Sequence, residues 1–342
     1  GETLSLSSGG SCASHSGPTA AQYLQYELPD EVLLAIFSYL FEQDLCRLAL
    51  VCKRFNTIAN DTELWKRLYQ SVFEYDLPLF NPELCKFVFE KPEESDFANP
   101  WKESFRQLYR GVHVRPGFQE RKSSGRNISF FNTIQAALDY PEEKAVAAAA
   151  TGAGAAAAAA AGLSNQIPGG GANVNALANL YEDNVPPTEH PGPLIFLHAG
   201  HYKGEYLFID SDVALIGAAP GNVAESVILE REAGSTVMFV EGAKYAYVGY
   251  LTLKFSPDVT STVSHHKHYC LDIGENCSPT VDNCIIRSSS VVGAAVCVGG
   301  VNANPVIRNC DISDCENVGL YVTDYAQGTY EHNEISRNAL AG

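Results

Sequence analysis

The stretches PTVDNCII at residues 279–286 and PVIRNCDI at residues 305–312 are two copies of one pattern, and the second begins 26 residues after the first. A third copy, YEHNEIS at residues 330–336, matches residues 307–313 at an offset of 23. Short β-forming segments that recur every roughly 20–30 residues, broken by Gly, Asn and Asp, are typical of a solenoid. The repeat therefore predicts a stack of parallel coils.

Side chains alternate in character along each copy, which predicts one face toward the core and one toward solvent. Second apolar strands lie between the copies, at residues 295–298 and 320–323, at close to the same period of 26. Cys284, Cys310 and Asn333 fall at one repeat position. Such a position forms a ladder through the stack, and we expect Asn333 to hydrogen-bond along it.

The upstream sequence fits the same plan. A short helix is expected at residues 132–138, followed by strands at 194–202, 213–217 and 247–253. The order TIQxAL, apolar strand, HxGxY and VxLIG resembles the opening coils of right-handed parallel β-helix proteins. Polysaccharide lyases and pectin esterases share that opening, so it indicates the fold and not the function. The recurrent Asn-Cys coil disfavours an α/β sheet or a β-sandwich.

Two segments interrupt or precede this pattern. Residues 145–192 contain a run of almost pure alanine followed by a glycine-rich stretch. We expect them to form a flexible insert at the corner of a coil, because surface insertions cost little stability. Residues 1–21 are rich in Ser and Gly and are expected to be a disordered tail. The β-helix at 112–342 ends without a closing pattern, so we expect the chain to be a fragment truncated at its C-terminus.

Residues 28–69, LPDEVLLAIFSYLFEQDLCRLALVCKRFNTIANDTELWKRLY, predict three short helices. Asp44 is the expected N-cap of the second helix, which continues through Cys52, and Asp61 or Thr62 is the expected cap of the third. The three helices carry more apolar surface than so small a unit can hide. A unit of about forty residues is marginally stable alone, so a partner is expected.

A further helix is expected between the helical unit and the coils. Asn99 is placed to cap it, Pro100 suits its first turn, and Gly111 follows its end. We therefore assign residues 73–111 to a linker that contains this connecting helix.

Several fixed positions of the helical unit resemble an F-box: LPDEV at 28–32, IFSYL at 36–40, DL at 44–45, VCKRF at 51–55 and LWK at 64–66. The resemblance implies an F-box domain at 22–72 that docks on the adaptor Skp1 and, through it, on cullin-1 and a RING protein. The alternative is an ordinary three-helix subdomain that packs only against its own chain. The residues expected to bind Skp1 are Leu28, Pro29, Val32, Leu33, Ile36, Phe37, Leu40, Leu45, Leu48, Val51, Cys52, Phe55, Leu64 and Trp65.

Apart from the insert, residues 22–342 are similar to the F-box only protein eleven-like family, animal F-box proteins that carry a right-handed parallel β-helix. The resemblance implies a multidomain α + β chain, with a small all-α F-box domain followed by a β-solenoid. It also implies a non-catalytic substrate-recognition subunit of an Skp1–cullin–F-box ubiquitin ligase, located in the nucleus and cytoplasm. The β-helix would recruit protein substrates at a surface that the sequence leaves unknown.

Composition narrows the function classes. The net charge is −17 and the pI is about 4.9, which argues against non-specific nucleic-acid binding. No apolar run has the length of a membrane span, so no membrane partner is expected. The ten cysteines show no CxxC pair and no zinc-type spacing, and we expect buried free thiols without a metal or other cofactor.

Two candidate sites compete with a purely binding role. Asp282, Asp311 and Glu334 lie at nearby repeat positions, with Arg287 and Arg308 beside them, as a β-helix lyase or esterase would require. Scattered charges of this kind are more often a solvated face. If these residues do form a site, the alternative function is a β-helix carbohydrate-active enzyme. A second and separate alternative is an Skp1-bound scaffold without a ubiquitination target.

A histidine-rich stretch is the other candidate. On a strand, His266, His268 and Cys270 would share one face and could hold zinc, with His265 beside them. Three such ligands at alternate positions crowd one ion, and a polar loop explains them equally well. We therefore predict no metal site.

Overall fold

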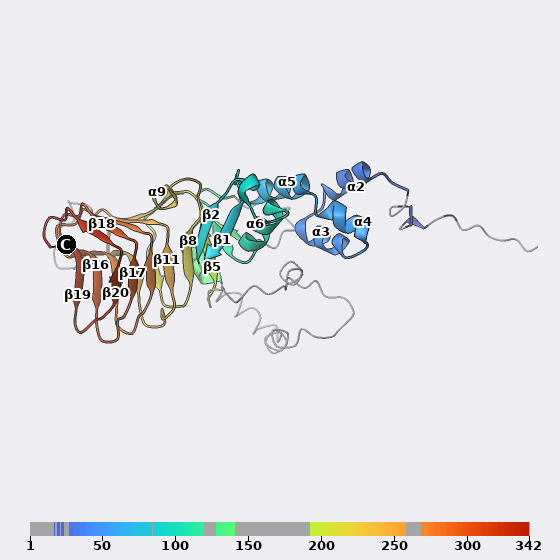
Figure 1. Ribbon diagram of the computed structural model, residues 1–342. Coiled ribbons are helices and arrows are strands. Elements are labelled where there is room, and N and C mark those ends of the chain that lie inside the picture. The colour runs from blue at the N-terminus through green and yellow to red at the C-terminus, as the bar shows by residue number, and fades with distance from the viewer. Residues whose placement is uncertain are drawn as a thin grey trace, which may run out of the picture. The chain divides into compact units, whose positions relative to one another are not determined.

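The computed structural model describes residues 17, 19–20, 22–23, 27–83, 85–119, 128–140, 192–257 and 268–341. The chain divides into two compact units, Gly1–Leu68 and Tyr69–Gly342 (Figure 1). Almost all of the predicted tail at 1–21 and of the predicted insert at 145–192 lies outside the described residues.

The first unit contains helices where the sequence predicts them, but residues 28–72 form four helices instead of three. They are α2 (Asp30–Phe37), α3 (Glu42–Ala49), α4 (Lys53–Ala59) and α5 (Thr62–Phe73), the last of which continues into the second unit. The predicted second helix is divided because Cys52 has an extended backbone and its sulfur accepts a hydrogen bond from Phe55 N at 3.4 Å, which caps α4. Asp44 is not the N-cap of α3; that position is Phe41.

Aromatic and aliphatic side chains fill the interior of the first unit. Phe37 and Phe55 make an edge-to-face ring contact with centroids 5.4 Å apart. The Trp65 indole N–H donates to Ala59 O at 2.7 Å, so this buried ring has its polar group satisfied. Asp61 caps α5 by accepting from Leu64 N at 2.9 Å, which confirms the predicted cap.

After the end of α5, the second unit continues with a hairpin that the sequence did not predict. Strands β1 (Leu79–Glu83) and β2 (Lys86–Phe89) pair antiparallel, and the short 3-10 helix η1 (Pro92–Glu94) follows. Helix α6 (Pro100–Tyr109) comes next, and the Asn99 side chain accepts from Lys102 N at 3.1 Å, as the capping prediction requires.

The remaining strands form the coils of a parallel β-helix, with three sheets along its length (Figure 1). In each full coil the chain passes from the eight-stranded sheet to the six-stranded sheet and then to the five-stranded sheet. In spatial order, the eight-stranded sheet contains β20 (Thr329–Glu331), β17 (Val306–Arg308), β14 (Thr280–Asp282), β11 (Tyr247–Gly249), β8 (Ala214–Gly217), β5 (Leu194–Leu197), β3 (Val112–Val114) and β4 (Phe130–Phe131). The six-stranded sheet contains β21 (Glu334–Ser336), β18 (Asp311–Ser313), β15 (Ile285–Ser288), β12 (Thr252–Phe255), β9 (Val227–Arg231) and β6 (Gly200–Lys203). The five-stranded sheet contains β19 (Val318–Thr323), β16 (Ala294–Gly299), β13 (Tyr269–Ile273), β10 (Ser235–Phe239) and β7 (Leu207–Ile209), and the short helix α9 (Val223–Ser226) precedes β9.

Strand register confirms the main repeat. Thr280 pairs with Val306 and Ile307 pairs with Tyr330, at the predicted offsets of 26 and 23. The alignment of the second strands was wrong, because Val296 pairs with Leu320 at an offset of 24. Strand β18 and the turn after it are each one residue shorter than β15 and its turn.

The predicted asparagine ladder is confirmed. Asn333 Oδ1 accepts from Cys310 N at 2.9 Å, and Asn333 Nδ2 donates to Ile307 O at 2.8 Å. A second ladder, which the sequence reading missed, places Asn338 against Cys315 N at 3.1 Å and Ile312 O at 3.1 Å. Each asparagine thus ties the last described coil to the backbone of the coil before it.

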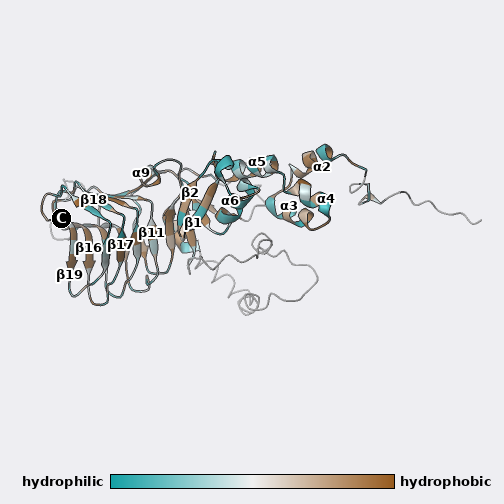
Figure 2. Cartoon of the chain, in the orientation of Figure 1, coloured by the Kyte–Doolittle hydropathy of each residue, from teal (hydrophilic) through white to brown (hydrophobic). Residues whose placement is uncertain are grey.

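The interior of the coils is apolar, and the strands are mostly brown in Figure 2. A helical turn at residues 134–140, close to the predicted 132–138, buries Ile134 and Ala137 in the same core. The Glu205 carboxylate accepts from the backbone N–H groups of Ile134 and Gln135 at 3.1 and 3.0 Å. A carboxylate is well suited to the start of a helix, where N–H groups lack partners within the helix.

Candidate functional site

The first unit exposes a set of large apolar side chains, which we call the apolar face. Tyr39 is 87% exposed, Leu50 69% and Val51 60%. Exposed residues at Val32, Ile36 and Tyr39 follow helical spacing along and just beyond α2. Brown segments on the helices of this unit are visible in Figure 2. The apolar face consists of Val32, Ile36, Tyr39, Phe41, Leu50 and Val51.

Polar contacts fix the helices that carry the apolar face. The Arg54 guanidinium forms an ion pair with Asp30 at 2.7 Å and also donates to Leu28 O. These contacts tie the start of α4 to the start of α2. Asn56 Nδ2 donates to Ala49 O at 3.0 Å, which satisfies a carbonyl at the end of α3. The apolar side chains are thus held on helices of fixed relative position within this unit.

The fourteen residues predicted to bind Skp1 fall into three groups. Pro29, Val32, Ile36 and Val51 are exposed, and Leu28, Leu40, Leu48 and Cys52 are half-buried. Six are buried and belong to the core of the unit, so in this conformation they support the surface and do not form it. These six are Leu33, Phe37, Leu45, Phe55, Leu64 and Trp65. The binding role of all fourteen stays a prediction.

Three members of the apolar face were not among the predicted residues. Tyr39, Phe41 and Leu50 are exposed, although their apolar character fits a core. The signal that could have identified Tyr39 is its position three residues after Ile36 and seven after Val32. Leu50 and Phe41 gave no such signal, because their exposure depends on where α3 begins and ends.

The second unit contains a groove of about 670 Å³. One wall comes from residues 77 and 87–89, around the β1–β2 hairpin. The other wall comes from residues 221–225 around α9, and from the turns between the eight- and six-stranded sheets, including Tyr250, Asn283 and Asn309. Its size is within the range of ligand-binding pockets. The groove thus combines segments that are about 130 to 230 positions apart in the sequence.

The carboxylates of the enzyme hypothesis are engaged in ion pairs and hydrogen bonds. Asp282 is buried, accepts from Tyr247 Oη at 3.1 Å and lies 3.3 Å from an Arg308 nitrogen. Asp311 pairs with Arg287 at 2.8 Å.

The pKa of Asp311 reflects this pairing. Partial burial raises that pKa, but hydrogen bonds from Arg287 and Ser313 outweigh burial, so the pKa of Asp311 lies below its ordinary value. A carboxylate with a lowered pKa is a poor general acid near neutral pH. The ion pairs Asp282–Arg308 and Asp311–Arg287 each join neighbouring coils, and this structural role explains the carboxylates without a catalytic function.

The histidine-rich stretch is only partly described. His265 and His266 lie outside the described residues. His268 Nδ1 lies 3.2 Å from Ser290 Oγ, and Cys270 is buried in the core of the coils. Burial raises the pKa of the Cys270 thiol to about 12. Across the described ranges, no three His, Cys, Asp or Glu side chains lie together as a metal site would need.

The described cysteines are free thiols, as predicted, and all but Cys52 are buried. Burial raises the pKa of Cys85 to about 12, and it raises the pKa of Cys284 well above the usual range. A thiol with a raised pKa holds little thiolate at neutral pH and is a weak nucleophile. Within the described parts of the chain, no helix has the length and apolar character needed to cross a membrane.

Comparison with protein families agrees with the two units. Residues 26–71 match the family described as F-box-like, and residues 259–342 match the right-handed β-helix region. No solved structure matches.

Three proteins with F-box names are similar to parts of this chain. F-box protein dre-1 of Caenorhabditis elegans is 33% identical over 92% of this chain, and the chain spans 30% of that protein. The ubiquitin ligase complex F-box protein UFO1 of Saccharomyces cerevisiae is 36% identical over 22% of this chain and 11% of its own length. F-box/LRR-repeat protein 5 of Mus musculus is 50% identical over 12% of this chain and 6% of its own length. The chain therefore carries an F-box-like helical region followed by a right-handed parallel β-helix.

Proposed function

We propose that this protein is a substrate-recognition subunit of an Skp1–cullin–F-box ubiquitin ligase and belongs to the F-box only protein eleven-like family. The observation that carries the proposal is the apolar face on the F-box-like unit. Several large exposed apolar side chains on one small unit are typical of a protein–protein interface. In this proposal the apolar face docks on Skp1, which connects the chain to cullin-1 and a RING protein.

The β-helix is the substrate-binding arm in this proposal, and the chain itself does not catalyse. The pairing of Asp282 with Arg308 and of Asp311 with Arg287 supports a non-catalytic role. Ubiquitin transfer would be accelerated by proximity, since a bound substrate lysine is held near the charged conjugating enzyme. We propose that the protein acts in the nucleus and cytoplasm, which imaging of the tagged chain in cells would test.

Binding to purified Skp1 tests the adaptor assignment. We expect Leu50→Ser and Val51→Ser each to weaken binding about tenfold or more, because a few large apolar side chains supply most of the binding energy of an interface. Glu63→Ser and Arg67→Ser, at exposed polar positions of α5, are the matched controls and should bind normally. Isothermal titration calorimetry with the 342-residue chain gives the affinities.

Buried positions need a different interpretation. Leu33→Ala and Trp65→Ala are expected to destabilise the unit by about 2–5 kcal/mol, so their loss of binding would report unfolding. Circular dichroism of every variant separates the two causes. If Leu50→Ser and Val51→Ser stay folded and bind Skp1 as well as the unaltered chain, the adaptor assignment is wrong.

The scaffold alternative makes a different prediction in cells. A substrate receptor that cannot bind Skp1 should leave its substrates undegraded, so their half-lives should lengthen in cells that express only the Leu50→Ser/Val51→Ser chain. Quantitative proteomics with a pulse label measures those half-lives. A set of proteins bound by the β-helix whose half-lives do not change would favour a scaffold.

A further inference from the structure

Strand β2 presents an edge to the groove. It belongs to a two-stranded sheet, so β1 covers only one of its edges. Phe87, Val88 and Phe89 all line the groove. Successive side chains of a strand point to opposite faces, so three consecutive residues line one groove when the strand edge borders it.

The register identifies which backbone groups this edge offers. Glu90 N donates to Pro78 O at 3.1 Å, and the next pair along is Leu79 with Phe89. Hydrogen-bonded and non-hydrogen-bonded pairs alternate in an antiparallel ladder, so Phe89 N–H and C=O point away from β1. On the opposite edge, Leu79 N donates to Ser104 Oγ at 3.0 Å, as this register requires.

The two outer edges of the hairpin therefore differ. Side chains of α6 cover the outer edge of β1, where Asn81 N also donates to Gln107 Oε1. Among the described residues, no backbone hydrogen bond joins Phe89 to a residue outside the β1–β2 pair. An unpaired strand edge is a template for a further strand, and peptide-binding domains use it in this way.

The opposite wall supplies groups that would read side chains. Tyr250, Asn283 and Asn309 occupy successive turns of the coils, each with a positive φ between 50° and 60°. The amide nitrogens of both asparagines donate to Asp282 Oδ1, at 2.7 and 3.1 Å, which leaves their side-chain oxygens as acceptors. Tyr250 adds an aromatic ring to the wall.

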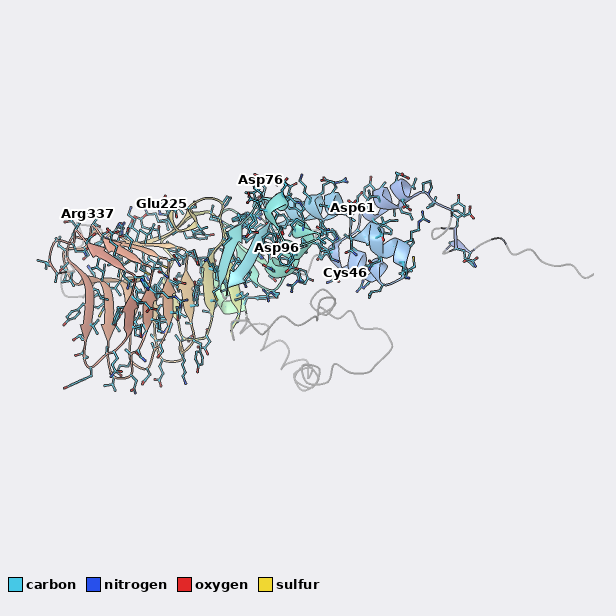
Figure 3. The ribbon with its side chains drawn as sticks, viewed as in Figure 1. Cys46, Asp61, Asp76, Asp96, Glu225 and Arg337 are labelled. Carbon is cyan, nitrogen blue, oxygen red and sulfur yellow. The ribbon has the colours of Figure 1, made fainter. Side chains whose placement is uncertain are left out.

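The charge of the groove is negative. Glu225 and Asp311 are the charged side chains of its lining, and the described lining includes no lysine or arginine. Asp311 is neutralised by Arg287, whereas Glu225 is exposed and forms no ion pair with a described residue. Glu225 belongs to α9, and Figure 3 shows it at the outer side of the coils. The groove thus favours a positively charged ligand group.

We propose that the groove binds an extended peptide segment of a protein substrate, which pairs with the free edge of β2. A lysine or arginine of the peptide lies beside Glu225, and an apolar side chain lies against Tyr250 and Phe89. The proposal rests on the proposed role of the β-helix as the substrate-binding arm. It assigns substrate binding to this one groove, and it identifies the substrate segment as an extended peptide with a basic and an apolar side chain.

The probe is a positional-scanning library of fluorescein-labelled decapeptides, titrated with the full chain and followed by fluorescence anisotropy. We expect pools with a fixed lysine or arginine at one position and an aliphatic residue two positions away to bind most tightly. Methylation of the peptide nitrogen that pairs with Phe89 O should weaken the best peptide about tenfold, because one backbone hydrogen bond is lost. Equal binding of all pools, or no effect of N-methylation at any position, overturns the proposal.

Charge reversal tests the groove itself. Glu225→Lys should weaken the best peptide about threefold to tenfold, as an ion pair near the surface is modest in strength. Glu241→Lys makes the same charge change at an exposed position outside the groove and should have no effect. Equal affinities of the two variants would contradict the proposal. Binding of maltohexaose without binding of any peptide pool would also overturn it, in favour of a glycan site.

Skp1 affinity, measured on the same variants, separates this inference from the proposed function. Normal Skp1 binding with no peptide binding means that the groove assignment fails alone. Peptide binding without Skp1 binding means that the groove exists and the adaptor role fails.

Discussion

At the scale of single residues, a buried histidine pair joins α6 to the first coils. His113 Nε2 lies 2.9 Å from Leu108 O, and His113 Nδ1 lies 2.9 Å from His198 Nε2. A carbonyl only accepts, so His113 Nε2 carries the proton, and the neutral His113 ring accepts at Nδ1 from His198 Nε2–H. Burial lowers the pKa of His113 to about 3 and lowers the pKa of His198 well below its ordinary value.

This pair makes the protein sensitive to acid. Histidine in the unfolded chain titrates near pH 6.5, so between about pH 6.5 and 3 the unfolded state binds more protons than the folded state. The buried, neutral histidines therefore contribute their full share of the folding stability above about pH 6.5, and this contribution is lost as the pH falls. His198→Gln keeps an N–H donor toward His113 and removes one titrating group. We expect the slope of unfolding free energy against pH, measured by urea titration from pH 6.5 to 4.5, to decrease by up to about 1.4 kcal/mol per pH unit.

A variant without an ionisable group provides the control for this measurement. Asn333→Ala removes no titrating side chain, so it should lower the free energy of unfolding without changing its slope against pH. Equal slopes for the unaltered chain and His198→Gln would show that His198 does not couple folding to pH.

At the scale of elements, the coils are joined by asparagine ladders as well as by sheet hydrogen bonds. Asn333 was predictable from the repeat because it shares a position with Cys284 and Cys310. Asn338 follows Asn333 by five residues, just as Cys315 follows Cys310, and that parallel was available in the sequence. The β1–β2 hairpin was not predictable in the same way, since its strands are short and one contains a proline.

Removal of one ladder residue should loosen the last described coils. In Asn333→Ala, Cys310 N–H and Ile307 O both lose their partner, so we expect a loss of about 2 kcal/mol in the free energy of unfolding. Thr329→Ala, on the exposed face of the same coil, should cost less than about 0.5 kcal/mol. Urea unfolding of the two variants measures both, and similar losses would argue against a structural role of the ladder.

At the scale of the whole molecule, the two proposed binding surfaces lie in different compact units. The apolar face belongs to residues 1–68, and the groove belongs to residues 69–342. The two surfaces share no residue, so we expect substitutions in one to be additive with substitutions in the other. The two surfaces should therefore bind their ligands independently.

A double variant tests this independence. Leu50→Ser/Glu225→Lys should show the Skp1 affinity of Leu50→Ser and the peptide affinity of Glu225→Lys, each within about 0.5 kcal/mol. Calorimetry and fluorescence anisotropy give the two affinities. A coupling larger than about 1 kcal/mol would show that binding at one surface alters the other.

The coils and the helical unit could be predicted from the sequence, because both depend on local patterns. The 26-residue repeat set the strand register of β14 and β17, and helical spacing placed α2 and α5. The exposure of individual apolar residues of the unit, such as Leu50 in contrast to Leu45, depends instead on how the helices pack together. The groove also depends on this packing, because Phe89 and Asn309 line it together although they are 220 positions apart in the sequence. Local periodicity specifies the element and its buried face, but contacts between distant segments arise only when those elements pack together.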